Sequence, residues 1–139
     1  MKLTLNQERY VETIYELCEE HGHAHTKAIA EALEIRMASV TEAIRALSEK
    51  NLVNYEVRKT ITLTEEGLQI AKALAQKHRV LATFLIEVLG CKSVEANKIA
   101  CRIEHVIGED FKQRVTSFTE FIKEKAPEKL TEFKQQYDK

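Results

Sequence analysis

Residues 26–50, TKAIAEALEIRMASVTEAIRALSEK, decide the fold. Thr26 is a plausible N-cap for a short helix over residues 27–33, and a four-residue connection leads to a second helix over residues 38–50. Apolar residues recur at helical spacing in the second segment, which predicts a buried stripe of Val40, Ile44 and Leu47. Two short helices joined this tightly, the second with small polar residues in its first turn, are typical of a helix-turn-helix.

The next stretch, residues 52–63 (LVNYEVRKTITL), has two alternating, β-rich arms around a charged tip at Arg58 and Lys59. This pattern predicts a hairpin, or wing. Thr64 then stands as the N-cap of a long helix over residues 65–89 with acidic residues in its first turn, and Gly90 ends that helix.

The rest of the chain is also expected to be helical. A helix over residues 6–20 precedes the quoted stretch, and helices over 94–107, 110–125 and from Pro127 onward follow it, with Ser93 as a possible cap. With one proline and four glycines in 139 residues, few positions interrupt these helices. The sequence predicts a mainly α protein, with a winged helix-turn-helix over residues 1–63 and a helical region over residues 64–139.

Bulk composition sets limits on the function. The net charge of −1 gives no global argument for nucleic acid binding, so a DNA-binding face has to come from local arrangement. Three cysteines, an odd number spaced far apart, do not resemble a disulfide framework. No apolar run approaches the length of a membrane span and no signal peptide is evident at the start, so we expect a cytoplasmic protein without membrane contact.

The segment with the most chemistry is residues 101–105, CRIEH. Positions three and four apart share a face of a helix, so the thiol of Cys101, the carboxylate of Glu104 and the imidazole of His105 are expected to project together. This donor mix suits Fe(II), Co(II), Ni(II) or Zn(II) and tolerates Mn(II). The residues alone leave a second interpretation open, in which Cys101 packs in the core and the other two form a solvated edge.

Several segments in order give the chain a resemblance to the diphtheria toxin repressor family, which includes the manganese transport regulators. The most specific part is the histidine of Lys77-His78-Arg79 followed by Cys-x-x-Glu-His at 101–105. The weaker segments, which together extend over about the first 110 residues, are YVETIYEL at 10–17, IAEAL at 29–33, SVT at 39–41 and LTEEG at 63–67.

This resemblance implies a homodimeric, metal-activated repressor of genes of metal homeostasis, with the helical region serving for dimerisation. It implies the metal ligands Glu12, His78, Cys101, Glu104 and His105. Cysteine at position 101 matches the iron-type members, so we favour Fe(II) over Mn(II), with Zn(II), Co(II) or Ni(II) as further possibilities.

The chain also departs from the family pattern. Arg9 stands where the family places a methionine or aspartate ligand, and a guanidinium cannot ligate a cation. Ala82 and Asn97 replace the glutamate and histidine that join the histidine at position 78 in the second site of iron-type members.

The expected partner is double-stranded operator DNA, bound by a dimer whose recognition helices match major grooves about 34 Å apart. Residues expected to face base edges are Arg36, Ser39, Thr41, Glu42 and Arg45. Residues expected to position the phosphates are Thr26, Lys27, Arg58 and Lys59.

Three other functions compete with this interpretation. The first is a winged-helix regulator without metal control that responds to a small molecule or to thiol oxidation, which Arg9 supports. The second is an enzyme with Cys101 as nucleophile and His105 as base, but no oxyanion-forming glycine loop or third orienting motif accompanies them, so we expect no enzymatic activity. The third is a winged helix that binds protein rather than DNA.

Overall fold

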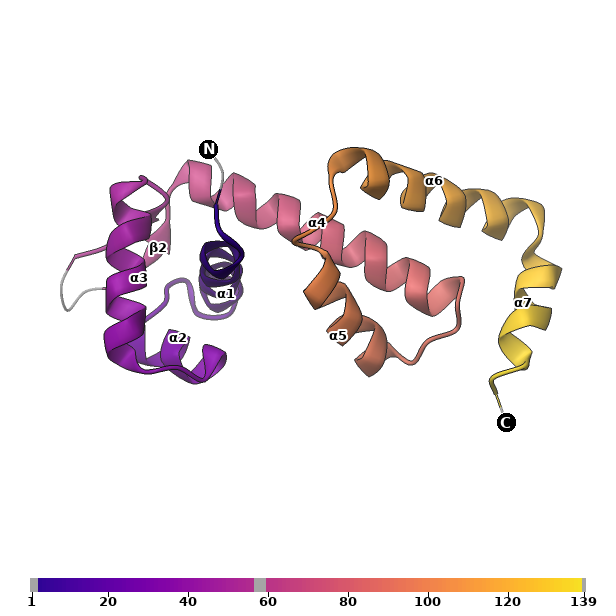
Figure 1. The fold of residues 1–139 in the computed structure, drawn as a ribbon, viewed down its shortest axis with the longest axis horizontal. Coiled ribbons are helices and arrows are strands. Elements are labelled where there is room, and N and C mark those ends of the chain that lie inside the picture. Colours follow the sequence, from indigo (N-terminus) through magenta and orange to yellow (C-terminus); the bar gives the residue numbers. More distant parts are fainter. Residues whose placement is uncertain (1–2, 57–59, 139) are drawn as a thin grey trace. The chain divides into compact units, whose positions relative to one another are not determined.

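A computed structural model describes residues 3–56 and 60–138 of the chain (Figure 1). These residues form seven helices and one two-stranded antiparallel sheet, so the predicted mainly α fold class is confirmed. The chain divides into two compact units, Met1–Ala73 and Leu74–Lys139, and the division falls inside helix α4 (Glu65–Glu87). Among the described residues, no helix is both long enough and apolar enough to cross a bilayer.

The amino-terminal unit contains the predicted helix-turn-helix and wing. Its elements, before the start of α4, are α1 (Leu5–His21), α2 (Thr26–Leu33), α3 (Met37–Glu49), β1 (Val53–Asn54) and β2 (Thr62–Leu63). The two strands pair antiparallel with Val53 opposite Leu63, and a further bridge joins Ala24 to Ile61. The tip of the wing, with Arg58 and Lys59, lies outside the described residues.

The core of this unit follows the predicted periodicity. Val40, Ile44 and Leu47 are fully buried along one side of α3. They belong to one cluster with Ile14 of α1 and Ile29 of α2. Because each such side chain contributes about 1.5–3 kcal/mol when buried, this stripe holds the three helices together. The opposite side of α3 is left for other contacts.

The Leu-Thr-x-x-Gly segment joins the wing to α4. Thr64 Oγ1 accepts a hydrogen bond from the Gly67 N–H (3.1 Å) and donates one to the Asn51 carbonyl (2.8 Å), so the predicted cap is confirmed. A Cβ atom at Gly67 would lie 2.1 Å from the Leu52 carbonyl oxygen. Glycine is therefore required because the first turn of α4 passes directly over the backbone that leads out of α3.

The carboxyl-terminal unit packs two helices against the second half of α4. Its further elements are α5 (Ser93–Ile103), α6 (Glu109–Lys125) and α7 (Pro127–Gln135). Figure 1 shows α5 and α6 beside this half of α4. On the α6 side, the rings of Phe84 and Phe118 have centroids 6.4 Å apart, and Lys123 Nζ lies 2.6 Å from Glu87 Oε1. Pro127 begins α7, as predicted.

Three predicted helix ends were wrong. The helical hydrogen bonds begin at the carbonyls of His25 and Lys92, so these residues, rather than Thr26 and Ser93, occupy the N-cap positions of α2 and α5. Helix α5 ends at Ile103 instead of residue 107, because the Val106 N–H donates to the Ile103 carbonyl and tightens the chain into a turn. Such ends depend on individual hydrogen bonds, which periodicity does not report.

Replacing Gly67 with alanine is expected to destabilise the amino-terminal unit by about 1–3 kcal/mol, because the added methyl group would push the first turn of α4 away from Leu52. The measurement is chemical denaturation followed by circular dichroism. Gly108→Ala is the matched control, since a Cβ atom there has nothing within 4 Å. Equal stability of the two variants would contradict the close approach.

Candidate metal centre and DNA-binding surface

Small residues bring α5 close to α4 at the candidate metal centre. Ala100 is fully buried and packs with Leu81 and Ala82 in an apolar cluster. His78 lies one turn before Ala82 on α4, and Glu104 lies one turn after Ala100 on the chain of α5. Since residues four apart share a helical face, the contact of the two alanines places His78 beside Glu104.

The Glu104 carboxylate lies between two imidazoles. Its Oε2 is 2.7 Å from His78 Nδ1, and its Oε1 is 3.3 Å from His105 Nε2. The side chain of Glu104 is fully buried and that of His105 is 2% exposed, whereas that of His78 is 30% exposed. Burial of a carboxylate is costly unless hydrogen bonds or positive charge compensate for it, and an imidazolium or a metal cation provides such charge.

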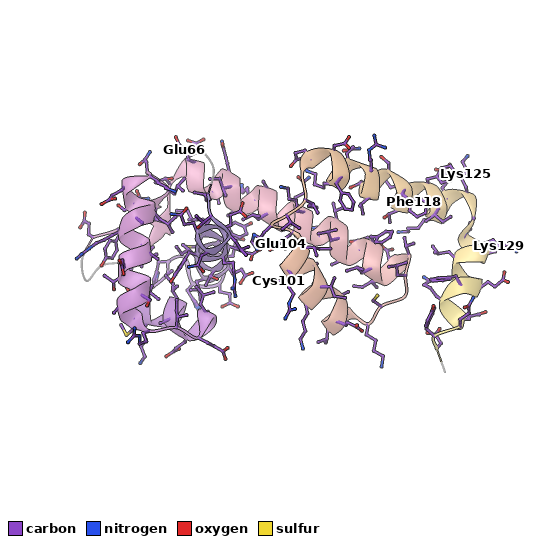
Figure 2. All side chains as sticks on the ribbon, in the orientation of Figure 1. Glu66, Cys101, Glu104, Phe118, Lys125 and Lys129 are labelled. Atoms are coloured by element: carbon purple, nitrogen blue, oxygen red, sulfur yellow. The ribbon has the colours of Figure 1, made fainter. Side chains whose placement is uncertain are left out.

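Cys101 adds a thiol to this cluster. Figure 2 shows Cys101 and Glu104 at the carboxyl-terminal end of α5. The Cys101 Sγ lies within 4.8 Å of a Glu104 carboxylate oxygen. Two donors that bind one ion at about 2.0–2.3 Å lie roughly 3 to 4.6 Å apart, depending on the angle between them, so this separation is compatible with a shared cation. The donors that the sequence assigned to residues 78–105 thus come together in one place.

Two polar side chains that the sequence did not identify lie close to these donors. Asn97 Oδ1 lies 2.9 Å from His78 Nε2, within hydrogen-bonding distance, whereas the sequence presents Asn97 only as a departure from the family pattern. Lys77 Nζ donates to the Ile107 carbonyl (2.9 Å) and ties the turn after Glu104 to α4. A signal for Asn97 was present, because positions 97, 101 and 104 share one helical face.

The remaining predicted ligand, Glu12, is half-buried on α1 of the amino-terminal unit, and Arg9 is exposed on the same helix. Glu12 remains a prediction from the family resemblance. Cys18, also on α1, packs against the core of this unit. Burial raises the pKa of the Cys18 thiol and favours its protonated form, as for a cysteine that packs in the interior.

The candidate DNA-binding residues were expected on the first turns of α3. Four of them are exposed, namely Arg36, Ser39, Glu42 and Arg45. The fifth, Thr41, is half-buried, and its hydroxyl donates to the Met37 carbonyl (3.0 Å), so this group is engaged within the helix. Among the residues assigned to phosphate contacts, Lys27 is exposed and Thr26 is half-buried. Their contacts with DNA remain predictions.

Two apolar residues at the start of α3 were not identified from the sequence. Met37 is 51% exposed and Ile35 is 38% exposed, although both are large hydrophobic side chains. The pattern treated them as a connection between helices. Both residues lie outside the buried stripe of α3, and this position could have indicated from the sequence that they are exposed. Apolar side chains at this end of a recognition helix can contact the methyl group of thymine.

Comparison with known proteins covers nearly the whole chain. The family model described as the N-terminal DNA binding domain of the iron dependent repressor matches residues 2–61. The model described as the metal binding and dimerisation domain of the iron dependent repressor matches residues 64–133.

Individual relatives agree with these matches. An uncharacterised HTH-type transcriptional regulator of Methanocaldococcus jannaschii is 35% identical over 119 residues, covering 85% of this chain and 95% of the relative. The HTH-type transcriptional regulator MntR of Shouchella clausii is 34% identical over 121 residues, covering 87% of this chain and 84% of the relative. The solved structure of the manganese regulator SloR matches with a TM-score of 0.72 and 30% identity over 86% of this chain. The chain spans about half, 55%, of that solved protein.

Replacing Glu104 with alanine is expected to lower the stability of the metal-free protein by about 3 kcal/mol. The substitution removes a buried carboxylate that contacts His78 and His105, and it leaves a cavity between α4 and the turn after α5. Denaturant titration measures the loss. The control Glu120→Ala removes an exposed carboxylate from α6 and should change stability by less than about 0.5 kcal/mol. A loss no larger than the control's would show that Glu104 contributes little to packing.

Proposed function

The chain belongs to the iron-dependent repressor family, and on this basis we propose that it is a transcriptional repressor that binds operator DNA as a homodimer when loaded with a divalent transition metal. The observation that supports metal control most directly is the buried Glu104 carboxylate, which two imidazoles flank and a thiol approaches. Winged-helix proteins need no such cluster to fold or to bind DNA.

The donor set fits a transition metal. The proposed ligands are Glu12, His78, Cys101, Glu104 and His105. A cation bound there would supply the positive charge that the buried carboxylate of Glu104 requires. Sulfur and imidazole donors favour Fe(II) over Mn(II), and they also suit Zn(II), Co(II) or Ni(II).

Metal binding has to change DNA binding. The family resemblance implies that Glu12 is a metal ligand. Because Glu12 lies on α1, such a ligand would couple the metal centre to the DNA-binding unit. For a hundredfold change in DNA occupancy, the metal has to favour the competent state by only about 2.7 kcal/mol. One additional metal–ligand contact in that state is sufficient for this difference.

Exposed aromatic residues in the carboxyl-terminal unit support self-association. On α6, Phe118 is 47% exposed and Phe121 is 57% exposed, and Tyr137 beyond α7 is 65% exposed. Large exposed apolar groups of this kind are common where two protein chains meet. A dimer would present two copies of α3 to two turns of DNA.

Replacing His105 with alanine is expected to abolish metal-stimulated DNA binding without unfolding the chain, because it removes an imidazole that contacts Glu104. The measurement is a mobility-shift titration with Fe(II), Mn(II), Zn(II) and Co(II), using an operator selected from random DNA. His21→Ala is the control, since it removes an exposed imidazole from the end of α1.

The two main interpretations give different results in this assay. If wild-type protein binds DNA equally well with and without every metal tested, the chain is a winged-helix regulator without metal control. In that case, DNA affinity that changes on thiol oxidation and is insensitive to oxidation in Cys101→Ser would identify a redox regulator.

The DNA surface is tested by comparing two cationic residues. Arg36→Ala is expected to cost about 1–3 kcal/mol on the selected operator and to relax the preference for guanine at one position. Lys27→Ala is expected to weaken binding to all sequences alike and to reduce the salt dependence by about one counterion. Fluorescence anisotropy at several salt concentrations separates these effects. Identical behaviour of the two variants would contradict the assignment of Arg36 to base edges.

A further inference from the structure

The side chain of Asn97 holds the outer nitrogen of His78. We propose that Asn97 is a positioning residue, which fixes the tautomer of His78 so that Nδ1 serves as the only metal donor of this ring. The inference rests on the proposed function and adds to it a residue outside the ligand set. It also predicts that His78 contacts a single ion.

The orientation of the Asn97 amide follows from its second contact. Asn97 Nδ2 donates to the Ser93 carbonyl at 2.8 Å, one turn earlier on α5. If the amide were reversed, two oxygens would face each other there, so the oxygen has to be the atom that lies 2.9 Å from His78 Nε2. An amide oxygen only accepts hydrogen bonds. His78 Nε2 therefore carries hydrogen and donates it.

The opposite nitrogen faces the metal centre. His78 Nδ1 lies 2.7 Å from Glu104 Oε2, on the side where the donors converge, so a hydrogen lies between these two atoms and a bound cation would take its place. With Nε2 engaged by Asn97, the ring has one orientation in which Nδ1 and the carboxylate point to the same place. Histidine ligands generally need such an outer partner to set tautomer and ring orientation.

Among the described residues, Asn97 is the side chain seen to hydrogen-bond to Nε2 of His78. The residue one turn further along α4 is Ala82, whose buried methyl group has no atom that could replace this contact. Without Asn97, the partly exposed ring of His78 would have water as its partner at Nε2, and both tautomers and ring flips would become accessible.

A purely structural role predicts a different result. Asn97 is exposed, so its hydrogen bonds contribute about 0.5–1.5 kcal/mol at most to folding. If that were its whole function, loss of the side chain would leave metal affinity unchanged. A positioning role instead predicts a loss of about 10- to 100-fold in metal affinity.

The test compares wild-type protein with Asn97→Ala and Asn97→Asp. Aspartate retains an oxygen that accepts from Nε2, so it should restore affinity to within a few-fold of wild type. Gln113→Ala is the control, because it removes an exposed amide from α6. Calorimetry with Co(II) gives the affinity, and nitrogen NMR of the histidine rings in the Zn(II)-loaded proteins gives the tautomer of His78, that is, which nitrogen binds the metal and which carries hydrogen. Circular dichroism checks that each variant is folded.

We expect the Co(II) affinity of Asn97→Ala to be about 10- to 100-fold weaker. In the Zn(II)-loaded wild type we expect His78 Nδ1 to bind the metal and Nε2 to carry hydrogen, a tautomer that becomes mixed only in the Asn97→Ala variant. Wild-type affinity together with an unchanged tautomer in Asn97→Ala would overturn the positioning role and leave the proposed function intact. A wild-type protein that binds no Co(II), Fe(II) or Mn(II) would overturn both.

Discussion

The contact between the Glu104 carboxylate and the two imidazoles imposes requirements on much of the carboxyl-terminal unit. Full burial of a carboxylate costs several kcal/mol unless cationic groups or hydrogen bonds compensate for it, so the surrounding residues have to hold their donors close. Ala82 and Ala100 are small enough to let α5 approach α4, and Lys77 fastens the turn that follows Glu104 through the Ile107 carbonyl. These residues bind nothing themselves, but without them His78 and Glu104 would not lie 2.7 Å apart.

The amino-terminal unit depends on a close backbone contact of a different kind. Thr64 joins Asn51, Leu52 and Gly67 by hydrogen bonds, and Gly67 leaves space for the Leu52 carbonyl that any side chain would fill. The end of α3 and the start of α4 are thereby fixed to each other. Because α3 carries the exposed residues proposed to meet DNA, this junction determines where the recognition surface lies within its own unit. A substitution at residue 67 would thus act on DNA binding without touching DNA.

The sequence predicted the elements that depend on repeating patterns. The buried stripe of Val40, Ile44 and Leu47 and the two arms of the wing follow from helical and alternating periodicity, and the structure contains both. The ends of helices were harder to predict from the sequence, because the end of α5 at Ile103 depends on a single tightened turn. The donor spacing of residues 101–105 identified the candidate centre, although Glu104 and His105 lie just beyond the helix that was expected to carry them. The spacing of positions 97, 101 and 104 places Asn97 on the face of the donors, but its contact with His78 joins residues 19 positions apart and could not be predicted from that spacing.

The burial of the donors suggests how the centre would distinguish among metals. The oxygen and nitrogen donors of Glu104 and His105 are buried, whereas Cys101 is an exposed residue at the edge of the cluster. Carboxylate and imidazole bind most divalent first-row metals, so the interior donors alone discriminate weakly. The thiolate is the donor that favours softer ions, and its position leaves it accessible to oxidants. Oxidation of Cys101 would therefore remove the soft donor from the proposed ligand set and leave the carboxylate and imidazole donors. The state of this one sulfur atom would then affect which metals the proposed centre binds.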